Sequence, residues 1–235
     1  MSELGWLIAR PVAHRGLHDA RAGVLENTPS AIAAAAAASY AIEVDLQVTA
    51  EGDAIVHHDA ALGRLTQGSD ALAARSVAEL KRVAFKATTD RMITLGELCD
   101  LVAGQVALVL ELKSLGDRDP RLPRRVAQVL KSYPGPAALM SFDPWPIAVL
   151  RELAPAWPRG LVATREVRVA AWIHAVITAR PNFIAYAVAD LPAAVPDAAR
   201  RWAGVPVLTW TVRTQAERRC AARFADQMIF EGFRP

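Results

Sequence analysis

The fold is decided by a short stretch at residues 42–48, which reads Ile42-Glu43-Val44-Asp45-Leu46-Gln47-Val48. Successive side chains of a β-strand point to opposite faces, so Glu43 and Asp45 share one face and the apolar residues share the other. A second apolar run ends in the same way, with Glu111 and Lys113 on one face. We therefore expect two strands that are apolar on one face and charged on the other.

Working outward from these strands, short apolar segments alternate with helical ones along the whole chain. We predict strands at 11–14, 42–48, 106–113, 138–141, 160–162, 183–186, 207–212 and 227–230, and helices at 30–39, 94–103, 122–132, 145–153, 167–179, 193–202 and 215–224. This alternation is typical of an α/β protein with a parallel (β/α)8 TIM barrel. Because no linker, repeat or charge block divides the chain, we predict a single domain over residues 1–235.

One segment interrupts the alternation. Residues 49–58 indicate a β-hairpin after the second strand, and a two-residue turn at Glu51-Gly52 would place Asp45 opposite His58. Residues 59–91 lack strong periodicity, so we expect a long loop with a short helix at 77–82 near the rim of the barrel.

The composition excludes several classes of protein. Lys and Arg number 27 against 24 acidic residues, a net charge of +3, which is too small to predict nucleic-acid binding but suits an anionic substrate. The two cysteines cannot form a disulfide framework, and we expect both to be reduced. Met1–Arg10 lacks the pattern of a signal peptide, and the longest uncharged stretch, 27–42, is too short to span a bilayer. We expect a cytoplasmic protein without stable membrane insertion.

The three carboxylates of Glu43, Asp45 and Glu111 require compensation if they meet inside a barrel. Buried carboxylates are costly without a counter-charge, and a hard divalent cation such as Mg²⁺ or Ca²⁺ takes oxygen ligands. Pairing with barrel arginines is the alternative, and the spacing of the residues leaves both open.

Two of the five histidines are candidates for proton transfer. His14 ends the first strand, and the hairpin brings His58 towards Asp45. Two imidazoles beside a metal-bound phosphate could accept and donate the protons that ester cleavage requires. Arg15 and Lys113 are candidates for phosphate binding. We interpret His18, His57 and His174 as surface or packing residues.

The sequence resembles the glycerophosphodiester phosphodiesterase family. The resemblance covers most of the chain and rests on short motifs in the expected order. They are Ala13-His14-Arg15-Gly16, Glu26-Asn27-Thr28, Glu43-Val44-Asp45-Leu46, the segment 58–66, Ile93-Thr94-Leu95-Gly96-Glu97-Leu98, Leu110-Glu111-Leu112-Lys113, Ser141-Phe142-Asp143 and Thr209-Trp210-Thr211-Val212.

This resemblance implies a metal-dependent TIM-barrel enzyme that hydrolyses small glycerophosphodiesters to an alcohol and sn-glycerol 3-phosphate. It implies metal binding by Glu43, Asp45 and Glu111, and acid/base catalysis by His14 and His58, without saying which histidine is the acid. It also implies phosphate contacts from Arg15 and Lys113. Two further residues are implied: Trp210 in the substrate pocket and Glu26 as a further metal or supporting residue.

The chain departs from the family at the last strand, which commonly ends in Thr-Asp but is followed here by Glu231-Gly232. The headgroup preference, the metal and the oligomeric state stay open. Two other functions are also compatible with the sequence: headgroup cleavage of phospholipids or lysophospholipids, and a catalytically silent barrel that binds a phosphorylated metabolite.

Overall fold

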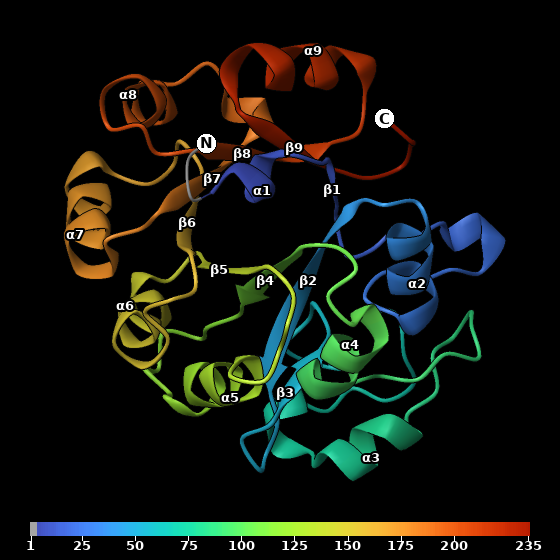
Figure 1. Ribbon diagram of the computed structural model, residues 1–235. Helices are drawn as coiled ribbons and strands as arrows, with labels where there is room; N and C mark the ends of the chain where they lie inside the picture. The colour runs from blue at the N-terminus through green and yellow to red at the C-terminus, as the bar shows by residue number, and fades with distance from the viewer. Residues whose placement is uncertain (1–3) are drawn as a thin grey trace.

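The protein forms a closed parallel barrel in a computed structural model that describes residues 4–235 (Figure 1). The strands are β1 (Val12–Ala13), β2 (Ala41–Val48), β3 (Ala54–Val56), β4 (Leu108–Leu112), β5 (Ala137–Ser141), β6 (Arg159–Ala163), β7 (Phe183–Ala187), β8 (Val207–Val212) and β9 (Gln227–Phe230). The ring order is β1-β9-β8-β7-β6-β5-β4-β2, and it closes because β1 also pairs with β2. β3 lies outside this ring, antiparallel to β2. The predicted (β/α)8 barrel with a hairpin after its second strand is confirmed.

Helices surround the ring, as Figure 1 shows. They are α1 (Gly5–Ile8), α2 (Pro29–Ala37), α3 (Val77–Arg82), α4 (Leu95–Val102), α5 (Arg121–Leu130), α6 (Pro144–Leu153), α7 (Val169–Ala179), α8 (Ala194–Trp202) and α9 (Gln215–Phe224), with short 3-10 helices at Ala20–Ala22, Leu72–Ala74 and Val188–Asp190. The predicted elements are all present, and their ends differ from the prediction by at most two residues. Side-chain caps explain these boundaries: Thr28 caps α2, and Thr94 and Glu97 form a capping box on α4.

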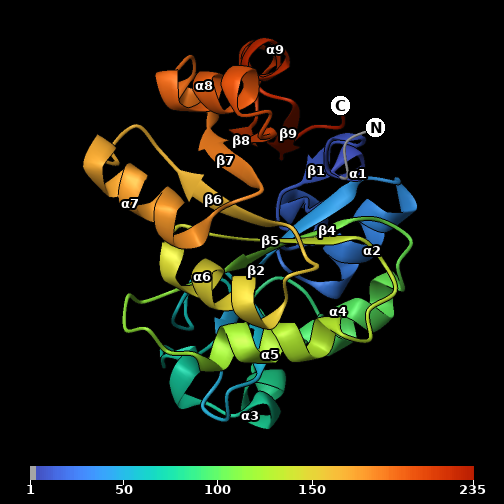
Figure 2. The ribbon, with the colours of Figure 1, turned by 60° about the vertical axis from the view of Figure 1, so that its left-hand side comes forward.

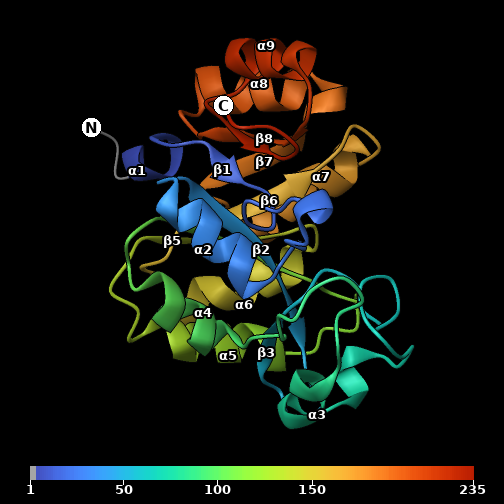
Figure 3. The same ribbon diagram turned by 90° about the vertical axis from the view of Figure 1, so that its right-hand side faces the viewer.

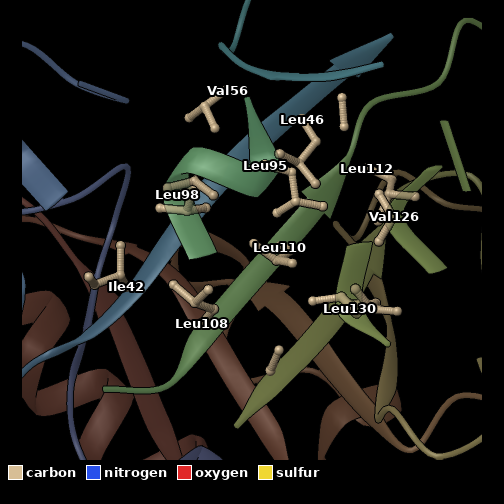
Figure 4. Packing of buried hydrophobic residues seen from close by; sticks show 14 of the residues in the cluster. Ile42, Leu46, Val56, Leu95, Leu98, Leu108, Leu110, Leu112, Val126 and Leu130 are labelled. Carbon is tan, nitrogen blue, oxygen red and sulfur yellow. The ribbon is translucent and has the colours of Figure 1, made fainter. Parts of the chain in front are cut away.

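The apolar side chains of the strands form two layers of buried core, one outside the ring and one inside it. Outside the ring, Ile42, Leu46 and Leu110 pack against helices α4 and α5 (Figure 4). Inside the ring, the side chains come from alternate residues, and Phe183 is fully buried among them. Burial of each such side chain contributes roughly 1.5–3 kcal/mol. The alternation predicted for residues 42–48 is therefore observed: the apolar side chains such as Ile42 and Leu46 point out of the ring, and the side chains between them point into it.

The amino end of the barrel is covered by α1, which the sequence did not predict. Leu7 of α1 is buried in the inner core, and the Gln227 side-chain amide donates a hydrogen bond to the Ile8 carbonyl. The predicted domain over 1–235 and the interpretation of Met1–Arg10 both include residues 1–3, which lie outside the described residues. Within residues 4–235, no helix is both long and apolar enough to cross a membrane.

The hairpin differs from its predicted register by one residue. Leu46 pairs with Val56 and Val48 with Ala54, so Asp45 faces His57 rather than His58. The reason is the turn, in which the Thr49 amide bonds to the Asp53 carbonyl and Gly52 adopts a left-handed φ of 84°. A three-residue turn of this kind shifts the pairing by one position relative to a two-residue turn.

The segment after the hairpin is a packed unit rather than a plain loop. Leu62, Leu72, Leu80 and Phe85 form a small buried cluster there, and α3 lies where the short helix was predicted. Figures 2 and 3 show this unit with β3 at one edge of the molecule, away from α8 and α9. His57 is buried against it, with its ring centroid 6.5 Å from that of Phe85.

Candidate active site

The carboxyl ends of the strands surround a pocket of about 350 Å³. The predicted site residues that line it are His14, Arg15, Glu43, His58, Glu111, Lys113 and Trp210. A larger hollow of about 710 Å³ lies at the amino end of the barrel, and none of the residues within 4–235 that line it is titratable. The chemistry available to the protein is therefore concentrated at the carboxyl end, where barrel enzymes place their active sites.

Three buried carboxylates lie together at the base of this pocket. Asp45 on β2 is paired in register with Glu111 on β4, and Glu43 precedes Asp45 on the same face. The carboxylate oxygens of the three residues lie within 4.8 Å of one another, and the residues are 1%, 1% and 7% exposed for Glu43, Asp45 and Glu111. This is the set of acids that the strand alternation predicted.

Two cations lie against these acids. Lys113 Nζ lies 2.7 Å from Asp45 Oδ1 and also donates to Glu111. Arg15 Nε lies 3.2 Å from Asp45 Oδ2, and the Arg15 backbone amide donates to Glu43 Oε2 at 2.9 Å. Burial raises the pKa of Asp45, but Lys113 and Arg15 more than offset this effect, so the pKa lies below its ordinary value. Asp45 is therefore paired with both Lys113 and Arg15 while it also belongs to the acidic cluster.

Among residues 4–235, no lysine or arginine side chain bonds to the Glu43 carboxylate. Burial, followed by repulsion from Asp45 and Glu111, raises the pKa of Glu43 well above its ordinary value. Its Oε1 atom is buried and has no hydrogen-bond partner among the described residues. An unpartnered carboxylate oxygen beside two other buried carboxylates is what an oxygen-liganded divalent cation requires. The residues present therefore fit a divalent metal ion.

His14 lies at the edge of this acidic cluster. Its Nε2 atom is 4.0 Å from Glu43 Oε2, on the pocket side. Its Nδ1 atom is 2.5 Å from Glu231 Oε2, and Glu231 also accepts from Arg213 Nε at 2.6 Å. Burial lowers the pKa of His14, while the hydrogen bond to Glu231 acts in the opposite direction.

His58 also lines the pocket and follows the hairpin immediately. Its Nδ1 atom is 2.9 Å from Asp59 Oδ1, and Arg64 Nε donates to the other Asp59 oxygen at 2.6 Å. Burial raises the pKa of Asp59, but the hydrogen bonds from Arg64 and His58 bring it down to about 2. The one-residue register change thus does not remove His58 from the site.

Glu26 lies outside the acidic cluster. Its Oε1 atom accepts hydrogen bonds from Arg15 Nη1 and Arg64 Nη2, both at 2.6 Å, and its Oε2 atom accepts from Arg64 Nη1 at 3.2 Å. Asn27, the next residue, donates to Asp45 Oδ2 at 2.8 Å and accepts from the Asp45 amide at 3.2 Å. In the structure Glu26 therefore orients arginines, and its role as a metal ligand stays a prediction.

The remaining wall of the pocket is mostly apolar, and the exceptions are Thr211, Arg213 and Glu217. Trp210 contacts Phe142 edge-to-face, with ring centroids 5.4 Å apart, and the lining also includes Met140 on β5, Val162 on β6 and Val188 directly after β7. Phe142 is half exposed. The charged wall can bind a phosphate, while this wall can contact the organic part of a substrate.

Sequence reasoning gave no role to three residues around His14: His18, Arg213 and Glu231. His18 was interpreted as a surface or packing residue, but its Nε2 atom lies 3.5 Å from Glu231 Oε2. The sequence offered one indication, the departure from Thr-Asp after the last strand. It drew attention to position 231 but did not indicate that Glu231 contacts His14.

The comparisons with known proteins agree with this geometry. Residues 14–232 match the glycerophosphoryl diester phosphodiesterase family. No curated protein matches the sequence.

Solved structures show the same fold. An Oleispira antarctica phosphodiesterase in complex with sn-glycerol-3-phosphate is similar, with a TM-score of 0.82 and 20% identity over 94% of this chain and 91% of that one. The Thermotoga maritima glycerophosphodiester phosphodiesterase has a TM-score of 0.75 and 23% identity, with 94% of each chain covered. A Parabacteroides distasonis enzyme of the same name has a TM-score of 0.76 and 19% identity over 94% and 92%.

The family match spans nearly the whole chain, from the histidine at the end of β1 to the residue after Glu231. It includes the strands that carry the buried acids and both candidate histidines. The chain therefore belongs to the glycerophosphoryl diester phosphodiesterase family and is an enzyme, a phosphodiesterase.

Proposed function

We propose that the protein hydrolyses small glycerophosphodiesters to an alcohol and sn-glycerol 3-phosphate, within a single catalytic domain. The observation that carries this proposal is one pocket in which two imidazoles flank three buried carboxylates. The sn-glycerol-3-phosphate in the Oleispira antarctica complex supports the same product.

Glu43, Asp45 and Glu111 would bind the metal ion, for which we propose Mg²⁺ or Ca²⁺. When bound, such an ion offsets the charge that develops on the phosphate oxygens. Lys113 and Arg15 line the pocket beside these acids. They would bind the remaining phosphate oxygens, Lys113 as a point charge and Arg15 through its planar guanidinium.

His14 and His58 would transfer the protons. One would deprotonate the attacking hydroxyl, and the other would protonate the departing alkoxide. The resemblance to the family supports initial attack by the glycerol 2-hydroxyl, followed by hydrolysis of a cyclic phosphate. The Nδ1 atoms of both rings contact carboxylates, so Nε2 would be the ring nitrogen that exchanges protons with the substrate.

The test is hydrolysis of glycerophosphocholine, with detection of glycerol 3-phosphate. We expect His14→Ala and His58→Ala each to lower kcat by about 10²- to 10⁴-fold, the usual contribution of a general acid or base. Chelation with EDTA should abolish turnover, and Mg²⁺ or Ca²⁺ should restore it. Turnover by both variants at the wild-type rate would refute the assignment. A wild-type protein that binds glycerol 3-phosphate without turnover would instead indicate the silent barrel.

A second substrate class is favoured by the apolar mouth of the pocket. Phe142 and Leu115, in the loops after β5 and β4, are 50% and 71% exposed. They could contact the acyl chain of a lysophospholipid. Comparing kcat/KM for glycerophosphocholine and lysophosphatidylcholine separates the two substrates, and Phe142→Ala should reduce only the second.

We also propose a reducing, cytoplasmic location. Cys99 and Cys220 are free thiols, and unpaired cysteines are typical of proteins from reducing compartments. Localisation of a tagged full-length chain tests this proposal.

A further inference from the structure

Glu231 connects His14 to Arg213 at the point where the barrel closes. Ala13 and Phe230 are register partners, and the His14 amide donates to the Phe230 carbonyl at 2.9 Å. The residues that follow these partners, His14 and Glu231, therefore lie side by side. Their side chains are only 13% and 19% exposed, so the hydrogen bond between them is shielded from water.

The charge on Glu231 determines the direction of this hydrogen bond. Burial opposes ionisation of Glu231, but the hydrogen bond from His14, with His18 Nε2 3.5 Å away, brings the pKa of Glu231 well below the ordinary value. An ionised carboxylate can only accept, so His14 must carry its proton on Nδ1. The Nε2 atom of the neutral ring then presents its lone pair to the pocket.

The second candidate histidine has the same arrangement. His58 Nδ1 contacts Asp59, and Asp59 accepts from Arg64, just as Glu231 accepts from Arg213. Each histidine of the pocket thus has a carboxylate on Nδ1 and an arginine behind that carboxylate. The two carboxylates come from segments far apart in the sequence: Asp59 follows β3, and Glu231 follows β9.

We propose that Glu231 is a positioning residue, which fixes His14 in the tautomer with a protonated Nδ1 and directs its Nε2 atom into the pocket. Arg213 orients the Glu231 carboxylate for this role. The proposal rests on the proposed function for its catalytic consequence, but the tautomer of His14 is a property of the folded protein alone. A carboxylate partner that selects one histidine tautomer is a general device of functional sites.

The variants to compare are Glu231→Gln and Glu231→Asp. A glutamine side chain can also donate from its amide, so it permits the opposite tautomer, whereas aspartate keeps the charge on a shorter side chain. Arg219→Gln on α9 removes an exposed arginine that makes no ion pair with residues 4–235. It controls for the effect of changing a surface charge outside the pocket.

Tautomers are measured by two-bond ¹⁵N–¹H correlations of the histidine rings, with His14→Ala used to assign the His14 signals. The wild type should show His14 protonated on Nδ1, and Glu231→Gln should shift it towards the Nε2-protonated form. Asp59→Asn should leave the His14 signals unchanged. Thermal melting of each variant confirms that it is folded.

The kinetic measurement compares the effect of each substitution on kcat with its effect on KM. Glu231→Gln should lower kcat roughly 10- to 100-fold with little change in KM, Glu231→Asp should recover part of the loss, and Arg219→Gln should match the wild type. An unchanged His14 tautomer in Glu231→Gln would overturn the proposal, as would an unchanged kcat. If the wild type lacks phosphodiesterase activity but the tautomer still shifts, the positioning role stands and the proposed function fails.

Discussion

At the scale of single residues, Glu43 is stabilised less well than the other acids of the pocket. Asp45 and Glu111 both pair with Lys113, whereas the Glu43 carboxylate accepts, within residues 4–235, only from the Arg15 backbone amide. Its raised pKa means that folding favours the protonated form. This contribution to stability is present below the ordinary pKa of a glutamate and is lost as the pH rises towards the folded-state value.

Glu43→Gln should therefore raise the melting temperature of the metal-free protein at neutral pH by a few degrees, because it removes a repelled charge. An effect of about 1 kcal/mol corresponds to roughly 2–4 °C in a protein of this size. The gain in melting temperature on adding Mg²⁺ or Ca²⁺ should disappear in this variant. Thermal melts with metal and with chelator, at neutral and acidic pH, measure both effects.

Glu26→Gln is the matched comparison for Glu43→Gln. Both Glu26 oxygens are bonded to arginines, so loss of the Glu26 charge should lower the melting temperature. The increase in melting temperature on adding Mg²⁺ or Ca²⁺ should remain in this variant. Loss of that gain in Glu26→Gln would support the metal-ligand role that the resemblance implied. A metal-dependent gain of wild-type size in Glu43→Gln would exclude Glu43 as a ligand.

At the scale of elements, the hairpin shows which part of the structure the sequence predicts. The alternation in residues 42–46 determines which side chains face the pocket, because the period of a strand is two residues. The register of β3 against β2 depends instead on the turn. Gly52 accepts a left-handed φ, and the Asp53 amide bonds to Thr49 Oγ1, which together extend the turn by one residue. Both turn lengths are compatible with the same residues, so the sequence alone did not decide between them.

Gly52→Ala should destabilise the protein by about 1 kcal/mol, because a Cβ atom disfavours the left-handed conformation. Urea denaturation followed by circular dichroism measures the change. Gly96→Ala provides a control of opposite sign, since Gly96 lies in the first turn of α4 without a positive φ and alanine favours helix. Equal effects of the two substitutions would contradict the left-handed conformation of Gly52.

At the scale of the whole molecule, the sequence predicted the order of the elements but not the contacts across the closed ring. His14 and Glu231 are 217 positions apart, and no local pattern relates them. The same is true inside the barrel, where Gly160 on β6 is paired with Phe183 on β7. A Cβ atom at Gly160 would collide with the ring of Phe183, so the small residue makes room for the large one.

Gly160→Ala should therefore cost roughly 1–3 kcal/mol through overpacking of the inner core. Phe183→Leu, combined with Gly160→Ala, should cost less than the sum of the two single substitutions, because the smaller side chain relieves the collision. Urea denaturation of the two single variants and the double variant measures this coupling. Additive effects would show that the two positions do not compete for space.

The pairing of β1 with β9 also has a consequence for biosynthesis. The ribosome makes His14 217 residues before Glu231, and Glu231 directly follows β9, the strand that closes the ring against β1. A nascent chain in which β9 is still inside the exit tunnel cannot complete the ring, however well its earlier helices have formed. Hydrolytic competence should thus arise abruptly once β9 has emerged from the ribosome rather than gradually during translation.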